Sequence, residues 1–163
     1  MDTLDLKPLK LIAKDIEDLK VLAAHLQDSM IPIMSMTYDP ETQTFRAVAN
    51  RFCWEHPEVV HDGEPLYHRT HTGVEIHNVK KVLRKGIDFK GAQRSYNLLT
   101  MHADNEGAIH LLFSGGGELR VEVEDIHLHL GDLHHPWPTR KKPKHIHDHI
   151  ADCAKSHHEF PIG

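Results

Sequence analysis

The C-terminal segment of the sequence carries a regular series of potential metal ligands. His145, His149, Cys153 and His157 are each four residues apart. On an α-helix, residues four apart are neighbours, so one ion can bridge such a pair. Imidazole and thiolate are both ligands that suit Zn²⁺. Successive steps of four drift by about 40° around the helix, so one helix supplies two or three of these ligands rather than four. The spacing indicates a candidate transition-metal site, with a solvated, ligand-rich tail as the alternative.

A second group of histidines precedes this segment, and nine of the 17 histidines of the chain lie within residues 127–163. The group consists of His127, His129, His134 and His135. In a β-strand the first two would share a face, as zinc-ligating pairs often do. In an α-helix, which we predict for this stretch, they lie about 200° apart. The group is therefore a weaker metal candidate, and histidines on the solvent side of a helix are the alternative.

The basic residues form two clusters that bear on nucleic-acid binding. The first cluster is Lys80, Lys81, Arg84 and Lys85, and the second begins at Arg140. Nucleic-acid-binding domains usually show a strong basic bias, whereas this chain has a formal net charge of −5 with histidine neutral. Solvated charge therefore explains the first cluster better, and weak RNA binding is an alternative.

The sequence shows no catalytic motif that can be defended. Cys53 lies between Phe52 and Trp54 in a predicted strand, where a free cysteine usually behaves as a small buried hydrophobe. Residues 114–117, Ser-Gly-Gly-Gly, are followed neither by Lys-Ser or Lys-Thr nor by a predicted helix. They match a hairpin turn better than a phosphate-binding loop. Since no Ser-His-Asp or paired-acid arrangement is recognisable, we do not expect an enzyme.

Length and composition are those of one folded domain. The chain has 163 residues, of which 39% are hydrophobic and 26% charged, as is typical of soluble globular proteins. Its apolar runs are far shorter than the roughly 18 residues that cross a bilayer, so we expect no membrane association. Two cysteines are too few for a disulfide scaffold and favour the cytoplasm. Prolines at 136, 138 and 143 divide the chain into an α+β domain over 1–138 and a basic, His-rich tail over 139–163.

The hydrophobic pattern predicts two helices. Apolar residues recur at spacings of three and four through residues 16–29, after Asp15 as N-cap. A second helix is predicted from about Asp125, because Ile126, Leu130 and Leu133 also follow at spacings of four and three.

Short strands are predicted before and between these helices. They cover residues 6–13, 31–38, 44–54, 72–82, 95–102, 108–113 and 118–124, with a polar surface loop over 55–67. Asp39-Pro40-Glu41 has the chemistry of a hairpin turn. The expected fold class is α+β, with a curved antiparallel sheet or half-open barrel of six to seven strands, an N-terminal-region helix and a C-terminal helix.

Several segments resemble a known family. They are 50–55 (Asn-Arg-Phe-Cys-Trp-Glu), 111–124, Asp132-Leu133, Pro136-Trp137, Thr139-Arg140 and Pro143. Over roughly residues 6–145 the chain resembles an uncharacterised alphaproteobacterial family, domain of unknown function 2948. The resemblance implies structural motifs and no established activity. The strand order also resembles a pleckstrin-homology-type barrel, which is a likeness of fold and not of function.

These observations lead to one hypothesis of function and two alternatives. The first is a non-catalytic cytoplasmic binding or accessory module for an unknown protein partner or small ligand, docking near Trp137 and Arg140. The first alternative is a protein that binds zinc, nickel or copper through its C-terminal histidines. The second alternative is a weak RNA-binding module.

Overall fold

The structure is a computed structural model that describes residues 7–56, 58–90, 94–143 and 158–159. Its strands and its α-helix are, in chain order, β1 (Lys10–Ala13), α1 (Ile16–Leu26), β2 (Ser29–Pro32), β3 (Thr37–Asp39), β4 (Thr44–Phe52), β5 (Val59–His61), β6 (Glu64–Ile76), β7 (Val79–Lys85), β8 (Ser95–Ala103), β9 (Ala108–Phe113), β10 (Glu118–Val123), β11 (Leu128–Asp132), β12 (Trp137–Thr139) and β13 (His158–Glu159). Short 3₁₀ turns at Ile33–Ser35 and Ser114–Gly116 complete the elements.

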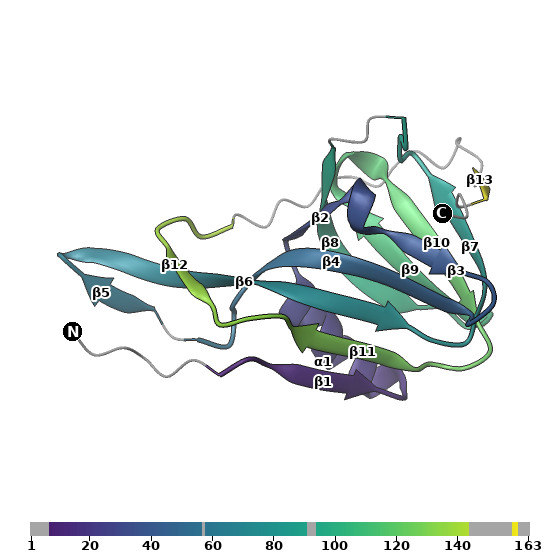
Figure 1. The fold of residues 1–163 in the computed structure, drawn as a ribbon, viewed down its shortest axis with the longest axis horizontal. Helices are drawn as coiled ribbons and strands as arrows, with labels where there is room; N and C mark the ends of the chain where they lie inside the picture. The colour runs from purple at the N-terminus through teal and green to yellow at the C-terminus, as the bar shows by residue number, and fades with distance from the viewer. Residues whose placement is uncertain (1–6, 57, 91–93, 144–157, 160–163) are drawn as a thin grey trace.

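The strands form one antiparallel sheet that is curved but not closed (Figure 1). Its order is β1-β11-β6-β4-β2-β8-β9-β10-β7-β13. β3 pairs with β4 beside this path, and β5 and β12 pair with β6. The long strand β6 therefore holds four neighbours and forms the centre of the half of the sheet that carries the site below.

Helix α1 forms where the sequence predicts it. The Asp15 carboxylate caps its first turn by accepting from the backbone N–H of Asp18 at 2.7 Å. Its buried leucines pack toward β8, β1 and β4; they are Leu19, Leu22 and Leu26. The helix ends at Leu26 rather than at residue 29, because Ser29 already belongs to β2 and pairs with β8.

The predicted C-terminal helix is wrong where the structure describes the chain. Residues 128–132 form strand β11, which lies between β1 and β6. Leu128 and Leu130 are buried, with 0% and 1% of their surface exposed. They alternate with half-buried residues, as in a strand with one buried face. The neighbouring strands β1 and β6 supply hydrogen-bond partners for the backbone of β11 on both sides. The strand is therefore favoured over the helix that the spacing of Ile126, Leu130 and Leu133 predicts.

Three other predictions need correction. The predicted loop over 55–67 contains β5 and the start of β6, which form a hairpin around Asp62 and Gly63, with φ of 53° and 77°. The predicted strand over 72–82 is two strands, because Asn78 adopts a left-handed φ of 59° and turns the chain. The described residues form 13 strands rather than six or seven. The predicted hairpins at 39–41 and 114–117 are confirmed.

Strands β6 and β11 bury one face and leave the other accessible. Val74 and Ile76 of β6 are buried, so the residues between and beside them point the other way. The register places His129 opposite Glu75 and Gly131 opposite Gly73. We call the accessible side, which carries these four residues, the outer face.

Candidate metal centre

Three side chains on the outer face come together as potential metal ligands. Glu75 on β6 and His129 on β11 are register partners, and His77 follows β6 directly. One oxygen or nitrogen atom from each of the three lies within 4.8 Å of the others. A carboxylate and two imidazoles form a ligand set that suits Zn²⁺ and other transition metals.

A fourth imidazole adjoins this group. The backbone N–H of His77 donates to the carbonyl of His127 at 2.9 Å, which holds the two residues side by side. The Nε2 atoms of His127 and His129 are 2.9 Å apart. This pair needs one donor and one acceptor, so at least one of its rings is neutral at that nitrogen. The correct strand assignment therefore restores the pairing of these two histidines that a helix would have prevented.

The His77 ring carries an unsatisfied nitrogen. Its Nε2 is buried and finds no hydrogen-bond partner among the described residues, although buried polar atoms are usually paired. Burial first, and then the neighbouring His129, lower the pKa of the His77 imidazole below its usual 6.5. The ring is therefore neutral at pH 7 and offers a lone pair, as metal binding requires.

One cation competes for this site. The Arg46 Nε donates to Glu75 Oε2 at 3.0 Å across the β4–β6 pair. Both side chains of this ion pair are more than a third exposed, at 49% and 38%, so the pair is weak. A carboxylate has about four lone-pair positions, so Glu75 can still ligate an ion while it accepts from Arg46.

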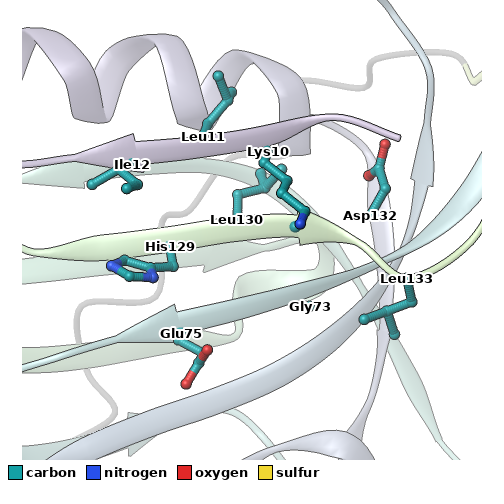
Figure 2. A pocket seen from close by; sticks show the side chains of 10 residues that line it. Lys10, Leu11, Ile12, Gly73, Glu75, His129, Leu130, Asp132 and Leu133 are labelled. Carbon is teal, nitrogen blue, oxygen red and sulfur yellow. The ribbon is translucent and has the colours of Figure 1, made fainter. Parts of the chain in front are cut away.

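Two of the three ligand residues, Glu75 and His129, line a hollow of about 350 Å³ in the outer face. Figure 2 shows Glu75 and His129 at one end of this hollow and Leu133 at the other. Gly73 and Gly131 lie between them, and a Cβ added at Gly131 would meet no atom within 4 Å. A Cβ added at Gly73 would meet Leu133 Cδ2 at 3.5 Å, so it is the missing side chain of Gly131 that leaves space open beside His129.

His134 and His135 do not join the ligand group. His134 Nε2 lies 2.9 Å from Nδ1 of His71, and His134 Nδ1 lies 3.0 Å from the carbonyl of His135. Trp137 packs on the rings of His71 and His134, with centroid distances of 4.8 and 5.6 Å. The predicted group of four histidines thus divides into two pairs at different places on the sheet.

The remaining predicted site residues lie elsewhere. Arg140 pairs with Glu64 at 3.3 Å near the β5–β6 hairpin. The four residues of the basic cluster all lie within β7; they are Lys80, Lys81, Arg84 and Lys85. The metal candidates of the tail, His145, His149, Cys153 and His157, lie outside the described residues.

The most buried charged group is one that the sequence reasoning did not single out. The Arg51 side chain is 0% exposed and donates to both oxygens of Glu55 at 2.8 Å. It also donates to Asp132 Oδ2 at 2.9 Å, and Asp132 accepts from Thr72 Oγ1 and from the backbone of Leu9. Burial opposes its charge, but these two carboxylates raise the pKa of Arg51 above its usual range. This network ties β4 to β11 and β1 and fixes the strands of the candidate centre.

Glu75 and His77 were also missed, although a signal for them exists. Gly73, Glu75 and His77 alternate with Val74 and Ile76 in the sequence, which places the polar residues on one face of a strand. The pattern indicates the face. His129 is placed beside Glu75 by the pairing of β11 with β6, whose partners are more than 50 residues apart in the sequence, and no local pattern contains this pairing.

Among the described residues, no helix combines the length and the apolar character that a membrane crossing requires. Comparison with curated proteins and with solved structures finds no significant match. Residues 9–145 match a family described as a protein of unknown function (DUF2948). This match contains every strand from β1 to β12 in full, and it includes all residues of the candidate centre. The chain therefore belongs to the DUF2948 family.

Proposed function

We propose that this protein binds a transition-metal ion, with Zn²⁺, Ni²⁺ and Cu²⁺ as the candidates, through Glu75, His77 and His129. The observation that carries the proposal is that one ligand atom from each of these three residues lies within 4.8 Å of the others. The buried Nε2 of His77, which has no partner among the described residues, supports it. His127 lies against His129 and supports the site either as a further ligand or as a hydrogen-bond partner.

The protein acts in this proposal as a metal-dependent binding module. Three protein ligands leave a coordination position open on a tetrahedral ion. The adjoining hollow, lined in part by Gly131, gives that position room for a small ligand. The proposal thereby joins the binding-module and metal-binding hypotheses, and it moves the metal from the tail to the sheet. The cytoplasm, favoured by the low cysteine count, is the proposed compartment.

Isothermal titration of the full, untagged chain with ZnCl₂ tests this proposal. His129→Ala and His77→Ala should each weaken zinc binding at least tenfold, because each removes a ligand. His25→Ala is the matched control, since His25 lies on α1, outside the ligand group, and its Nδ1 lies 2.9 Å from the carbonyl oxygen of Val21. Equal affinity in the wild type and in both ligand variants would refute the site.

The tail needs a separate arm of the same titration. A variant with His149→Ala and Cys153→Ala removes two of the four regularly spaced ligands. The proposal predicts that the tightest zinc-binding event survives this change. If that event is lost in this variant while His129→Ala binds zinc as tightly as the wild type, the metal site lies in the C-terminal residues instead.

The other two functions receive less support. Trp137 packs on His71 and His134, which accounts for its position without a partner protein. The basic cluster on β7 is partly neutralised, since Lys81 lies opposite Glu122 and Lys80 is 4.0 Å from Glu124. Fluorescence-anisotropy titration with a short single-stranded RNA would detect the RNA alternative, and we expect no saturable binding.

A further inference from the structure

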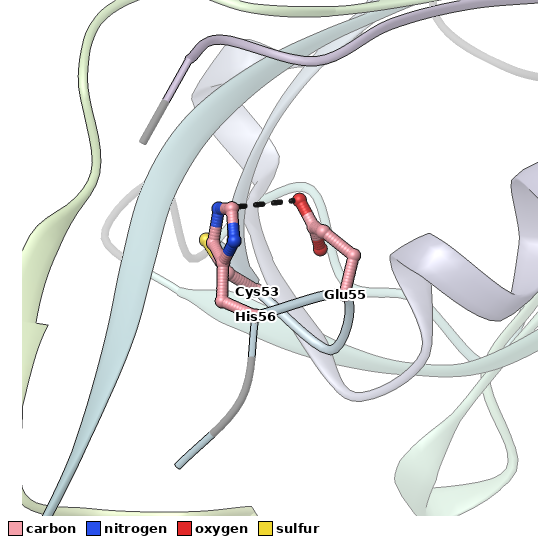
Figure 3. A group of neighbouring side chains, drawn as sticks. All are labelled: Cys53, Glu55 and His56. Atoms are coloured by element: carbon pink, nitrogen blue, oxygen red, sulfur yellow. Dashed lines mark ion pairs between the residues drawn. The ribbon is translucent and has the colours of Figure 1, made fainter. Parts of the chain in front are cut away.

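A second cluster of metal-ligating side chains lies where β4 ends. Cys53, Glu55 and His56 belong to the turn that follows Phe52 (Figure 3). The backbone N–H of Cys53 donates to the carbonyl of His68 at 2.9 Å, and that of His56 donates to the carbonyl of Cys53 at 3.2 Å. This turn brings one ligand atom of each of the three side chains within 4.8 Å of the other two. Figure 3 shows the Cys53 sulfur beside the His56 ring, with the Glu55 carboxylate facing that ring.

The cluster contains buried nitrogen atoms that lack partners. His56 Nε2 lies 3.8 Å from Glu55 Oε2, too far for a hydrogen bond. This nitrogen and Nδ1 of the neighbouring His68 are buried, and neither has a partner in the part of the chain that the structure describes. Two ligands of one tetrahedral zinc ion, each about 2.0–2.2 Å from it, are separated by about 3.3–3.6 Å. The His56–Glu55 separation is close to that value.

The charges around the cluster favour a divalent cation. The Arg51 guanidinium forms ion pairs with the carboxylates of Glu55 and Asp132. The sum of these three charges is −1. The nearby cation Arg69 is offset by Asp28, whose charge acts on it. A Cys53 thiolate would add a second negative charge. A dication would then bring this buried region to neutrality, which the low polarity of the site requires.

We propose that Cys53, Glu55 and His56 form a second metal site, suited to Zn²⁺, that is separate from the outer-face centre. Binding replaces the S–H bond of Cys53 with a sulfur–zinc bond, and the released proton passes to the solvent buffer. Without metal, burial raises the pKa of the Cys53 thiol to about 12, so the ion itself must displace the proton. The ion reaches the sulfur past Glu55 and His56, whose side chains are 21% and 17% exposed.

Cobalt absorption separates this site from every other in the chain. Co²⁺ is the probe, because a cobalt–thiolate bond gives a near-ultraviolet charge-transfer band that histidine and carboxylate ligands do not give. The full, untagged chain carries Cys153→Ser as background, so that Cys53 is its one remaining cysteine. We expect titration with CoCl₂ to produce this band, with a final intensity that corresponds to one cobalt–thiolate bond per chain. Absence of the band would overturn the proposal.

Three variants in that background complete the test. Cys53→Ser should abolish the band, and His56→Ala should weaken cobalt binding at this band at least tenfold. His129→Ala should leave it unchanged, because that residue belongs to the outer-face centre. Circular dichroism verifies that each variant folds, and His56→Ala keeps the test decisive if Cys53→Ser unfolds. A band that is unaffected by His56→Ala would overturn the assignment without touching the outer-face proposal.

Discussion

Replacement of Arg51 by methionine tests the buried network that holds the strands of the candidate centre. The guanidinium makes two bonds of 2.8 Å to Glu55, bonds of 2.9 and 3.2 Å to Asp132, and one of 3.2 Å to Thr72. Methionine fills a similar volume but leaves two carboxylates without their counter-charge. The Asp132 side chain is 1% exposed, so water cannot replace the lost partner.

The expected loss follows from that burial. Removing one partner of a buried ion pair costs about 3–5 kcal/mol, whereas a domain of this size is stable by about 5–15 kcal/mol in total. Arg51→Met should therefore remove about a fifth or more of the free energy of unfolding. Arg51→Lys keeps the positive charge but cannot form the bidentate hydrogen bonds of the guanidinium. Its stability should therefore lie between those of the wild type and Arg51→Met.

Urea unfolding followed by circular dichroism, at pH 7 in EDTA, measures the change. Lys20→Met is the matched control, because the Lys20–Glu17 pair is 3.4 Å long with side chains 69% and 82% exposed. Such a pair contributes less than about 1 kcal/mol. A loss below about 1 kcal/mol for Arg51→Met, equal to that of the control, would refute the reasoning. The deficit should also shrink as the pH falls, because a buried carboxylate without a partner relieves its cost by taking up a proton.

Three further predictions concern the metal and the pH dependence. Arg46→Gln should strengthen zinc binding about threefold, because it removes a positive charge 3.0 Å from Glu75; titration calorimetry that shows unchanged or weaker binding would contradict this. Zinc at a hundredfold excess over its Kd should stabilise the fold by about 2.7 kcal/mol, which raises Tm by about 5–10 °C; the rise should reverse with EDTA and be smaller in His129→Ala, and scanning calorimetry checks both. Hydrogen bonding to His110, which outweighs the opposing burial, lowers the pKa of Asp104 from 3.8 to about 2. Asp104 therefore stabilises the fold above about pH 4, and this contribution is lost as the pH falls toward 2, so Asp104→Asn should be less stable than the wild type at pH 7 and should approach it near pH 2. Unfolding curves that keep a constant difference over this range would exclude the His110–Asp104 pair as its source.

Local patterns predicted those elements whose stabilising contacts are near in sequence. Helix α1 has its N-cap, its acidic first turn and its apolar stripe within one short segment. The β9–β10 hairpin has its glycine turn between two alternating strands. These features follow from capping and periodicity alone.

The region around β11 could not be predicted in the same way. Ile126, Leu130 and Leu133 fit a helical spacing, whereas Leu128 and Leu130 fit a strand, and the choice depends on partners distant in sequence. β11 pairs with β6 and β1, and Asp132 bonds to Arg51 from 81 residues away. The same pairing brings together the proposed metal ligands Glu75 and His129, so the error in secondary structure also hid the candidate site.

Anomalous diffraction from crystals of the zinc-loaded protein, measured at the zinc absorption edge, tests the central claim most directly. We predict an anomalous peak on the outer face of the sheet, about 2 Å from a carboxylate oxygen of Glu75 and from ring nitrogens of His77 and His129. Well-ordered crystals in which these three side chains surround no anomalous peak, while zinc is bound elsewhere on the chain, would contradict it.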